Sequence, residues 1–150
     1  MKLAGSCGRI ITAVFVLSAG STALHPAELV LADKQKTAYV IVCGENASES
    51  EKFAAQELAA YLSKSSSATF SVMTESSAIP KTKRLFVGPT EFATQNGLVA
   101  SKLDREEWAI KTIGNDLVIV GGKPRGTLYG VYEFLETQIG CHWLDPYTEI

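Results

Sequence analysis

The segment over residues 48–64 restricts the fold of this chain most, because its helical pattern is apolar on almost every side. Ser48 followed three residues later by Glu51 is a capping-box pattern, which predicts that a helix begins there. The apolar positions comprise a main stripe (Ala54, Leu58, Tyr61, Leu62) and a set that covers most of the remaining circumference (Phe53, Ala55, Ala59, Ala60). A helix of this kind is normally covered on more than one side. We therefore expect a layered domain with a second surface packed over this helix.

A second helix is predicted over residues 127–139. It ends at Gly140, a residue type that commonly follows the last turn of a helix. Its predicted core stripe consists of Leu128, Val131, Tyr132, Leu135 and Ile139. Tyr129 and Phe134 lie off this stripe, so this helix also has apolar residues on a second side.

Five short apolar or alternating segments predict strands, over residues 37–43, 69–74, 84–87, 107–113 and 117–120. The last two are joined by a Gly-Asn-Asp turn and form the strongest hairpin signal in the chain. Because a hairpin pairs its strands in opposite directions, a fully parallel sheet is excluded. The predicted order is strand, helix, two strands, a short helix, two strands and a helix.

The first residues have the layout of a secretory signal peptide. Lys2 and Arg9 precede an apolar run over residues 10–19, and Ser21 and Ala23 occupy the −3 and −1 positions of a plausible cleavage site. The run is about half the ~20 residues that a membrane-spanning helix needs. We expect a signal peptide over residues 1–23, cleavage between residues 23 and 27, and a periplasmic or extracellular protein without a membrane span. The alternative for the apolar run is a buried N-terminal strand.

Composition and length exclude several classes of function. The chain has 150 residues and a formal charge of −2, without a basic stripe, so we expect no nucleic-acid partner. It is too short for a complete (β/α)8 barrel, which needs roughly 200 residues or more. Three cysteines and two histidines are too few for a disulfide scaffold or a closed zinc site. Cys43 and Cys141 either form a disulfide after export or act as small buried hydrophobic residues.

The glycine-rich run over residues 121–126 does not fit a nucleotide-binding loop. In a P-loop a Ser or Thr follows the lysine, whereas here Lys123 is followed by Pro124. The glycines are explained by a tight connection between a strand and a helix. The alternative is that Arg125 and the N-terminus of the helix bind a carboxylate or a partner domain. Cys141 and His142 are adjacent and their side chains diverge, so they do not form a nucleophile and base. We predict no catalytic, cofactor-binding or metal-binding residues in this chain, and no cofactor.

Several motifs together resemble a known domain. The most specific motif is the run from Ile119 to Glu136, which contains Gly-Gly, Pro-Arg-Gly-Thr-Leu-Tyr-Gly and Leu-Glu, and it is followed by Gly-Cys-His-Trp-Leu from Gly140. Three further motifs precede it in the chain: Asn46-Ala47-Ser48, Ala54-Ala55-Gln56-Glu57-Leu58 and Phe86-Val87-Gly88. Over residues 36–146 the chain resembles the N-terminal accessory domain of glycoside hydrolases such as bacterial alpha-glucuronidases and beta-N-acetylhexosaminidases. The resemblance implies an α+β fold with a mixed, mostly antiparallel sheet of about five strands and two main helices on one face.

The resemblance also implies a function. We expect a non-catalytic N-terminal domain of an exported carbohydrate-active hydrolase, with a catalytic (β/α)8 barrel downstream in the same polypeptide and absent from this chain. The helices would pack on that barrel, polysaccharide would be a further partner, and the docking residues would be Arg125, Tyr129, Phe134 and Phe53. The alternative is a free-standing extracytoplasmic module that binds a glycan or a protein.

Overall fold

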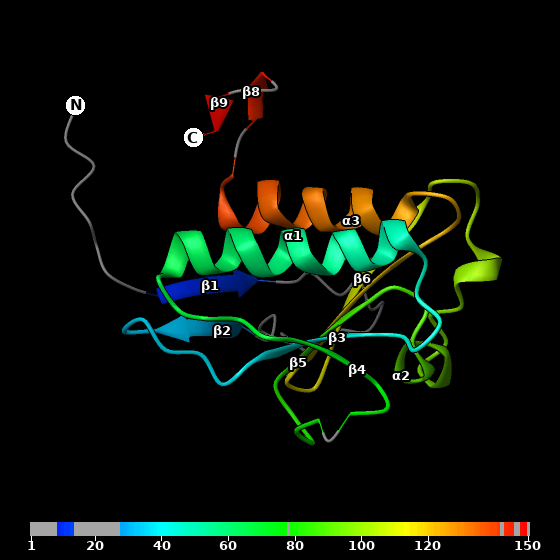
Figure 1. Ribbon diagram of the computed structural model, residues 1–150, viewed down its shortest axis with the longest axis horizontal. Helices are drawn as coiled ribbons and strands as arrows, with labels where there is room; N and C mark the ends of the chain where they lie inside the picture. The colour runs from blue at the N-terminus through cyan, green and yellow to red at the C-terminus, as the bar shows by residue number, and fades with distance from the viewer. Residues whose placement is uncertain (1–8, 14–27, 78, 142, 146–147, 150) are drawn as a thin grey trace, which may run out of the picture.

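Two parallel helices lie side by side over one face of a five-stranded sheet (Figure 1). The computed structural model describes residues 9–13, 28–77, 79–141, 143–145 and 148–149. The helices are α1 (Glu49–Ser66) and α3 (Gly126–Phe134), and a π-helical segment, η2 (Leu135–Ile139), continues α3. No helix in the described part of the chain has the length and apolar character to cross a membrane.

The sheet has the strand order β4-β3-β5-β7-β6. Its strands are β3 (Val40–Cys43), β4 (Val72–Thr74), β5 (Arg84–Val87), β6 (Trp108–Ile113) and β7 (Asp116–Gly121). The expected α+β class, the mixed sheet and its five strands are confirmed. The expectation of a mostly antiparallel sheet is wrong, because β3 pairs in parallel with β4 and β5, and β5 pairs in parallel with β7.

The physical reason for the parallel majority lies in the connections between the strands. Long segments containing α1 or α2 (Glu91–Gln95) link the parallel strands, and such crossovers bring the chain back in the same direction. The tight turn at Gly114 and Asn115 is the exception, and it makes β6 antiparallel to β7 as predicted.

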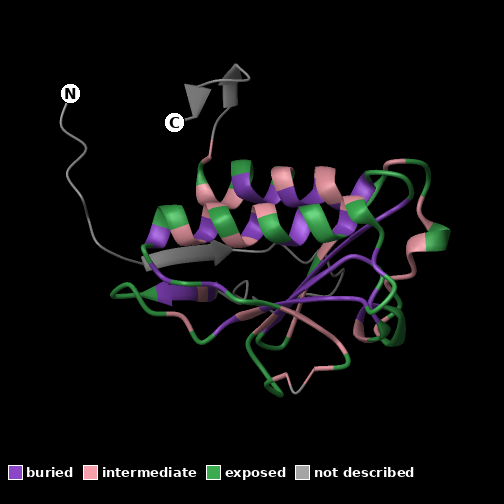
Figure 2. Cartoon of the chain, in the orientation of Figure 1, coloured by how far each residue is buried: buried purple, intermediate pink, exposed green. Residues whose placement is uncertain are grey.

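Each face of the sheet has its own core. On one face the side chains of Ile41, Leu85 and Leu117 pack beneath α1 and α3, which confirms two main helices on one face. On the other face Phe86 and Val118 pack beneath α2 and a short 3-10 helix, η1 (Ala100–Lys102). Figure 2 shows that the buried residues of the two helices face the sheet and that their exposed residues point away from it.

Helix α1 begins as the sequence predicts. The backbone N–H of Ser48 donates to Glu51 Oε2 at 2.6 Å, and the N–H of Glu51 donates to Ser48 Oγ at 3.4 Å, which completes the capping box. Of the predicted stripe, Ala54, Leu58 and Leu62 are fully buried, while Tyr61 is half-buried.

Helix α3 with its continuation η2 buries Val131 and Leu135 of the predicted stripe, but the buried side is displaced and also includes Phe134. Phe134 is fully buried with Val131 and Leu135, whereas the predicted core residues Leu128 and Tyr132 are half-buried at the edge of the core. At the first turn the buried Thr127 accepts a hydrogen bond from the N–H of Gly121, so this side of the helix faces the end of β7.

A separate strand pair lies next to the helix layer. Strand β1 (Arg9–Ala13) pairs antiparallel with β2 (Glu28–Asp33), and β2 was not predicted from the sequence. The strand at residues 9–13 agrees with the alternative interpretation of the apolar run, which was an N-terminal strand. The signal peptide concerns cleavage of the chain after synthesis, and it stays a prediction. Most of residues 1–23 lie outside the described residues. A second small pair consists of β8 (Trp143–Asp145) and β9 (Thr148–Glu149).

Cys43 and Cys141 do not form a disulfide with each other, and they lie near opposite ends of the helix layer. Cys43 is the last residue of β3, just before α1, and Cys141 follows η2 at the other end of the helix layer. The two ends of this layer are separated by the length of α1, which is ~27 Å for its 18 residues. This is far beyond the Cα separation that a disulfide permits. Burial raises the pKa of the Cys43 thiol, whose Sγ donates to the carbonyl of Met73 at 3.5 Å. The interpretation of Cys43 as a small buried residue is confirmed.

The capping box gives the first testable prediction. Replacing Ser48 with Ala removes the acceptor for the N–H of Glu51 and should lower the free energy of unfolding by about 1 kcal/mol. Chemical denaturation followed by circular dichroism measures this change. Ser71→Ala, an exposed serine outside any helix, is the control and should change little. Equal effects of the two substitutions would show that the cap does not stabilise α1.

Candidate docking surface

A hydrogen bond joins α1 and α3 across the helix layer. Tyr132 Oη donates to Glu57 Oε2 at 2.8 Å. Burial of Tyr132, together with the hydrogen bond to Glu57, raises the pKa of the phenol well above its ordinary value. The phenol therefore stays neutral at physiological pH, and it serves as the donor that ties the two helices together.

Three of the four predicted docking residues lie on this layer near the N-terminal ends of the helices. Phe53 precedes Glu57 by one helical turn and is 46% exposed. Arg125 is exposed at the N-cap position of α3, and Tyr129 is half-buried in its first turns. The fourth residue, Phe134, is fully buried in the core, so it is not part of an outward surface.

Trp108 extends this surface onto the edge strand of the sheet, and sequence reasoning did not select it. It lies on β6 and is 40% exposed. A Cβ atom at Gly130 would lie 3.0 Å from Trp108 Cβ, so the missing side chain of Gly130 lets Trp108 lie against α3. A glycine in the middle of an apolar helix was the signal that an aromatic residue packs there.

We define the docking surface as Phe53, Arg125, Tyr129 and Trp108. It combines three aromatic side chains and one cation on neighbouring elements, because α3 packs against both α1 and β6. Aromatic residues and arginine are the types that dominate binding energy at protein interfaces. These residue types make the four positions candidates for contact with another protein domain.

The glycine-rich connection before α3 is confirmed as a tight strand-to-helix turn. A Cβ atom at Gly122 would collide with the carbonyl of Asp104, and one at Gly121 would collide with the backbone at Gly126. The N–H groups of Gly121, Gly122 and Gly126 donate to Thr127 Oγ1, Glu107 O and Gly122 O at 3.0, 2.8 and 2.9 Å. Because these donors are used within the protein, they do not form a phosphate cradle.

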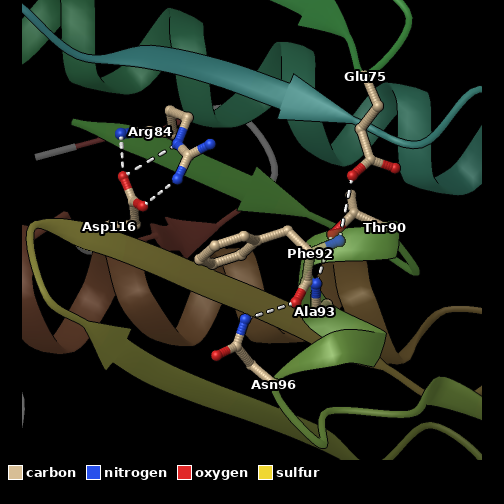
Figure 3. Close-up of polar contacts among 7 residues, drawn as sticks. All are labelled: Glu75, Arg84, Thr90, Phe92, Ala93, Asn96 and Asp116. Carbon is tan, nitrogen blue, oxygen red and sulfur yellow. Dashed lines mark hydrogen bonds and ion pairs between the residues drawn. The ribbon is translucent and has the colours of Figure 1, made fainter. Parts of the chain in front are cut away.

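A pocket of about 420 Å³ lies where the parallel strands β3, β4 and β5 end. Its lining includes three carboxylates, of Glu45, Glu75 and Glu91. Glu75 accepts hydrogen bonds from the backbone N–H of Glu91 at 2.9 Å and of Phe92 at 3.3 Å, so it holds the start of α2. Figure 3 shows the contact with Phe92. A hydrogen bond from Ser76 lowers the pKa of Glu45.

Two of the carboxylates of this pocket therefore make structural hydrogen bonds. Glu45 accepts a hydrogen bond from Ser76, and Glu75 accepts those from the start of α2. In the described part of the chain, no cluster of three or more His, Cys, Asp or Glu side chains is arranged to hold a metal ion.

A second polar cluster lies at the opposite ends of the central strands. Arg84 on β5 and Asp116 on β7 form a two-point ion pair, with Arg84 Nη2 2.6 Å from Asp116 Oδ2 and Nε 3.2 Å from Oδ1. The backbone N–H of Arg84 also donates to Oδ1 at 2.8 Å (Figure 3). The guanidinium lies over the rings of Phe86 and Phe92, which stack at 4.3 Å.

These features define the chain as an α+β domain with internal polar clusters and with exposed aromatic side chains at Phe53 and Trp108. Residues 24–134 match the family described as glycosyl hydrolase family 67 N-terminus, and the chain belongs to this family. It is thus an N-terminal domain of the glycoside hydrolase type, as the resemblance implied.

Among solved structures, the chain is similar to a GH138 enzyme targeting pectin rhamnogalacturonan II, with 15% sequence identity and a TM-score of 0.46. The similarity covers 75% of this chain and 11% of that protein, so the chain spans a small part of its length. No curated protein sequence shows significant similarity.

The ion pair between β5 and β7 gives a second prediction. Asp116→Asn removes the charge that compensates the mostly buried Arg84, and this should lower the free energy of unfolding by about 3 kcal/mol. Glu49→Gln, which breaks the exposed Glu49–Lys52 pair at the start of α1, is the matched control and should have almost no effect. Urea denaturation of both variants makes the comparison, and equal losses would contradict a structural role of the buried pair.

The interhelical hydrogen bond gives a third prediction. Tyr132→Phe should lower the free energy of unfolding by about 1 kcal/mol, whereas Tyr129→Phe on the outward side should change it little. Since the pKa of Tyr132 is higher in the folded than in the unfolded state, its contribution is complete below pH ~10 and declines as the pH rises further. The difference between the original chain and Tyr132→Phe should therefore shrink above pH ~10. A pH-independent difference would contradict this account.

Proposed function

We propose that this chain is the non-catalytic N-terminal domain of an exported glycoside hydrolase of the alpha-glucuronidase or beta-hexosaminidase type. In this proposal the domain packs against and orients a catalytic (β/α)8 barrel that follows in the same polypeptide, and the whole enzyme acts on a polysaccharide. The observation that carries the proposal is the family match over residues 24–134. The match starts directly after residue 23, where the signal peptide is predicted to end, which supports export.

The docking surface supplies the contact with the barrel. Phe53 and Trp108 are the large apolar side chains of this surface that remain most exposed. Removing such aromatic area from water contributes up to ~1.5–3 kcal/mol for each side chain that becomes fully buried. Arg125 adds a cation at the start of α3, where it can form a two-point ion pair with a carboxylate of the barrel.

The experiment compares the parent enzyme with the 150-residue chain. Phe53→Ala and Arg125→Ala should each lower the melting temperature of the parent enzyme by a few degrees, because each removes part of the interdomain contact. The same substitutions should leave the melting temperature of the 150-residue chain unchanged. Lys81→Ala, an exposed residue in the loop before β5, is the control and should have no effect in either protein.

Activity provides the second readout of the same experiment. The parent should hydrolyse a glucuronide or an N-acetylhexosaminide, and the substrate accepted decides between the two enzyme types. The 150-residue chain should hydrolyse neither. Hydrolysis by the short chain, or equal melting shifts in both proteins, would overturn the accessory-domain proposal. Glycan binding by a stable, monomeric short chain would favour the alternative of a free-standing module.

A further inference from the structure

Strand β2 belongs to the core of the domain but not to its main sheet. Leu29 and Leu31 are 4% and 1% exposed and pack in the same cluster as the inner sides of α1 and α3. The strand partner of β2 among the described residues is β1 (Figure 1). The hydrophobic contacts of Leu29 and Leu31 therefore hold β2 in place, and the edge that faces β1 needs a separate strand.

The backbone pairing identifies the residues on that edge. Val30 is in register with Ile11, and Ala32 is in register with Ile10. Leu31 lies at the irregularity between these two pairs, and its carbonyl accepts a hydrogen bond from Thr37 Oγ1 at 2.6 Å. Val30 and Ala32, which are paired with Ile11 and Ile10, are thus the positions to follow in an experiment on the edge that β1 occupies.

The strand that occupies this edge lies outside the family domain. Strand β1 consists of residues 9–13, whereas the family match covers residues 24–134 and includes β2. Residues 9–13 also lie within the predicted signal peptide, so cleavage would remove β1 and leave β2 with an unpaired edge. Exposed strand edges promote aggregation, and proteins normally cover them.

We propose that in the mature protein a strand from the polypeptide after Ile150 replaces β1 on the open edge of β2. This inference rests on the proposed function, which supplies both the cleavage and the following domain. The position of η2 supports this occupant, because η2 contacts β1 and the chain continues from η2 through Gly140. The polypeptide therefore leaves the helix layer beside the edge that needs a strand.

Two physical arguments favour a strand of the same polypeptide over a second copy of the chain. A tethered strand acts at an effective concentration in the millimolar range, so a short pairing is sufficient. Pairing of two six-residue β2 strands across a two-fold axis would bury far less than the ~1,200 Å² of a stable interface.

The first arm of the test uses the 150-residue chain. Ile10→Pro/Ile11→Pro removes the two N–H groups in register with Ala32 and Val30, and Ile10→Val/Ile11→Val is the matched control that retains them. Hydrogen exchange at Val30 and Ala32 should be at least ~10-fold faster in the proline variant than in the control. Adding a synthetic peptide of residues 8–14 should restore slow exchange in the proline variant. Equally slow exchange in both variants would overturn the proposal.

The second arm uses the mature parent enzyme, beginning at residue 24. Val30 and Ala32 should exchange slowly there, and the peptide of residues 8–14 should not bind because the edge is already filled. Fast exchange, or binding of the peptide, would overturn the proposal. Slow exchange that is accompanied by dimer formation, measured by native mass spectrometry, would assign the edge to a second copy and would also overturn it.

Glycosidase activity, measured on the same parent preparation, separates this inference from the proposed function. An active enzyme with fast exchange at Val30 and Ala32 would keep the proposed function and reject the added strand. A monomeric protein with slow exchange but without glycosidase activity would support the added strand and reject the enzyme assignment.

Discussion

The ion pair between Arg84 and Asp116 is the interaction on which the arrangement of the sheet depends. It joins the first residues of β5, the central strand of the sheet, and of its neighbour β7, and it includes the backbone N–H of Arg84 as well as the side chain. Because a strand that slips by one residue exchanges its two faces, a contact that aligns two strand ends sets which residues enter each core. With Leu85 opposite Leu117, both side chains face the helix layer.

The same cluster also determines what covers the second face of the sheet. The guanidinium of Arg84 lies over the stacked rings of Phe86 and Phe92, which links the central strand to α2. At the other end of the strands, Glu75 and Thr90 bind the first N–H groups of α2. The short helix α2 is therefore held by contacts from two different strand ends, although five residues are too few for an independently stable helix.

Sequence patterns predicted the elements whose determinants are local. The capping box at Ser48 and the hairpin turn at Gly114 depend on residues only a few positions apart, and both are confirmed. The direction of strand pairing depends on long connections, so the antiparallel majority implied by the resemblance was wrong. Phe134 was assigned to the outward side, because the side of α3 that faces the sheet cannot be read from the helix sequence alone. The contact between Thr127 of α3 and Gly121 of β7 joins two different elements, so no local pattern predicts it. Trp108 was missed for a similar reason, since its position depends on packing against Gly130.

The docking surface and the edge of β2 lie at different parts of the domain, and they differ in chemistry. The docking surface offers aromatic side chains and one arginine near the first turns of α1 and α3, where a rigid partner gains affinity from buried area. The edge of β2 offers backbone groups near η2, where a partner must be an extended strand. A following domain that used both would be fixed at two separated points of this domain. Rotation about either single contact would then be prevented, which is what orienting a neighbouring domain requires.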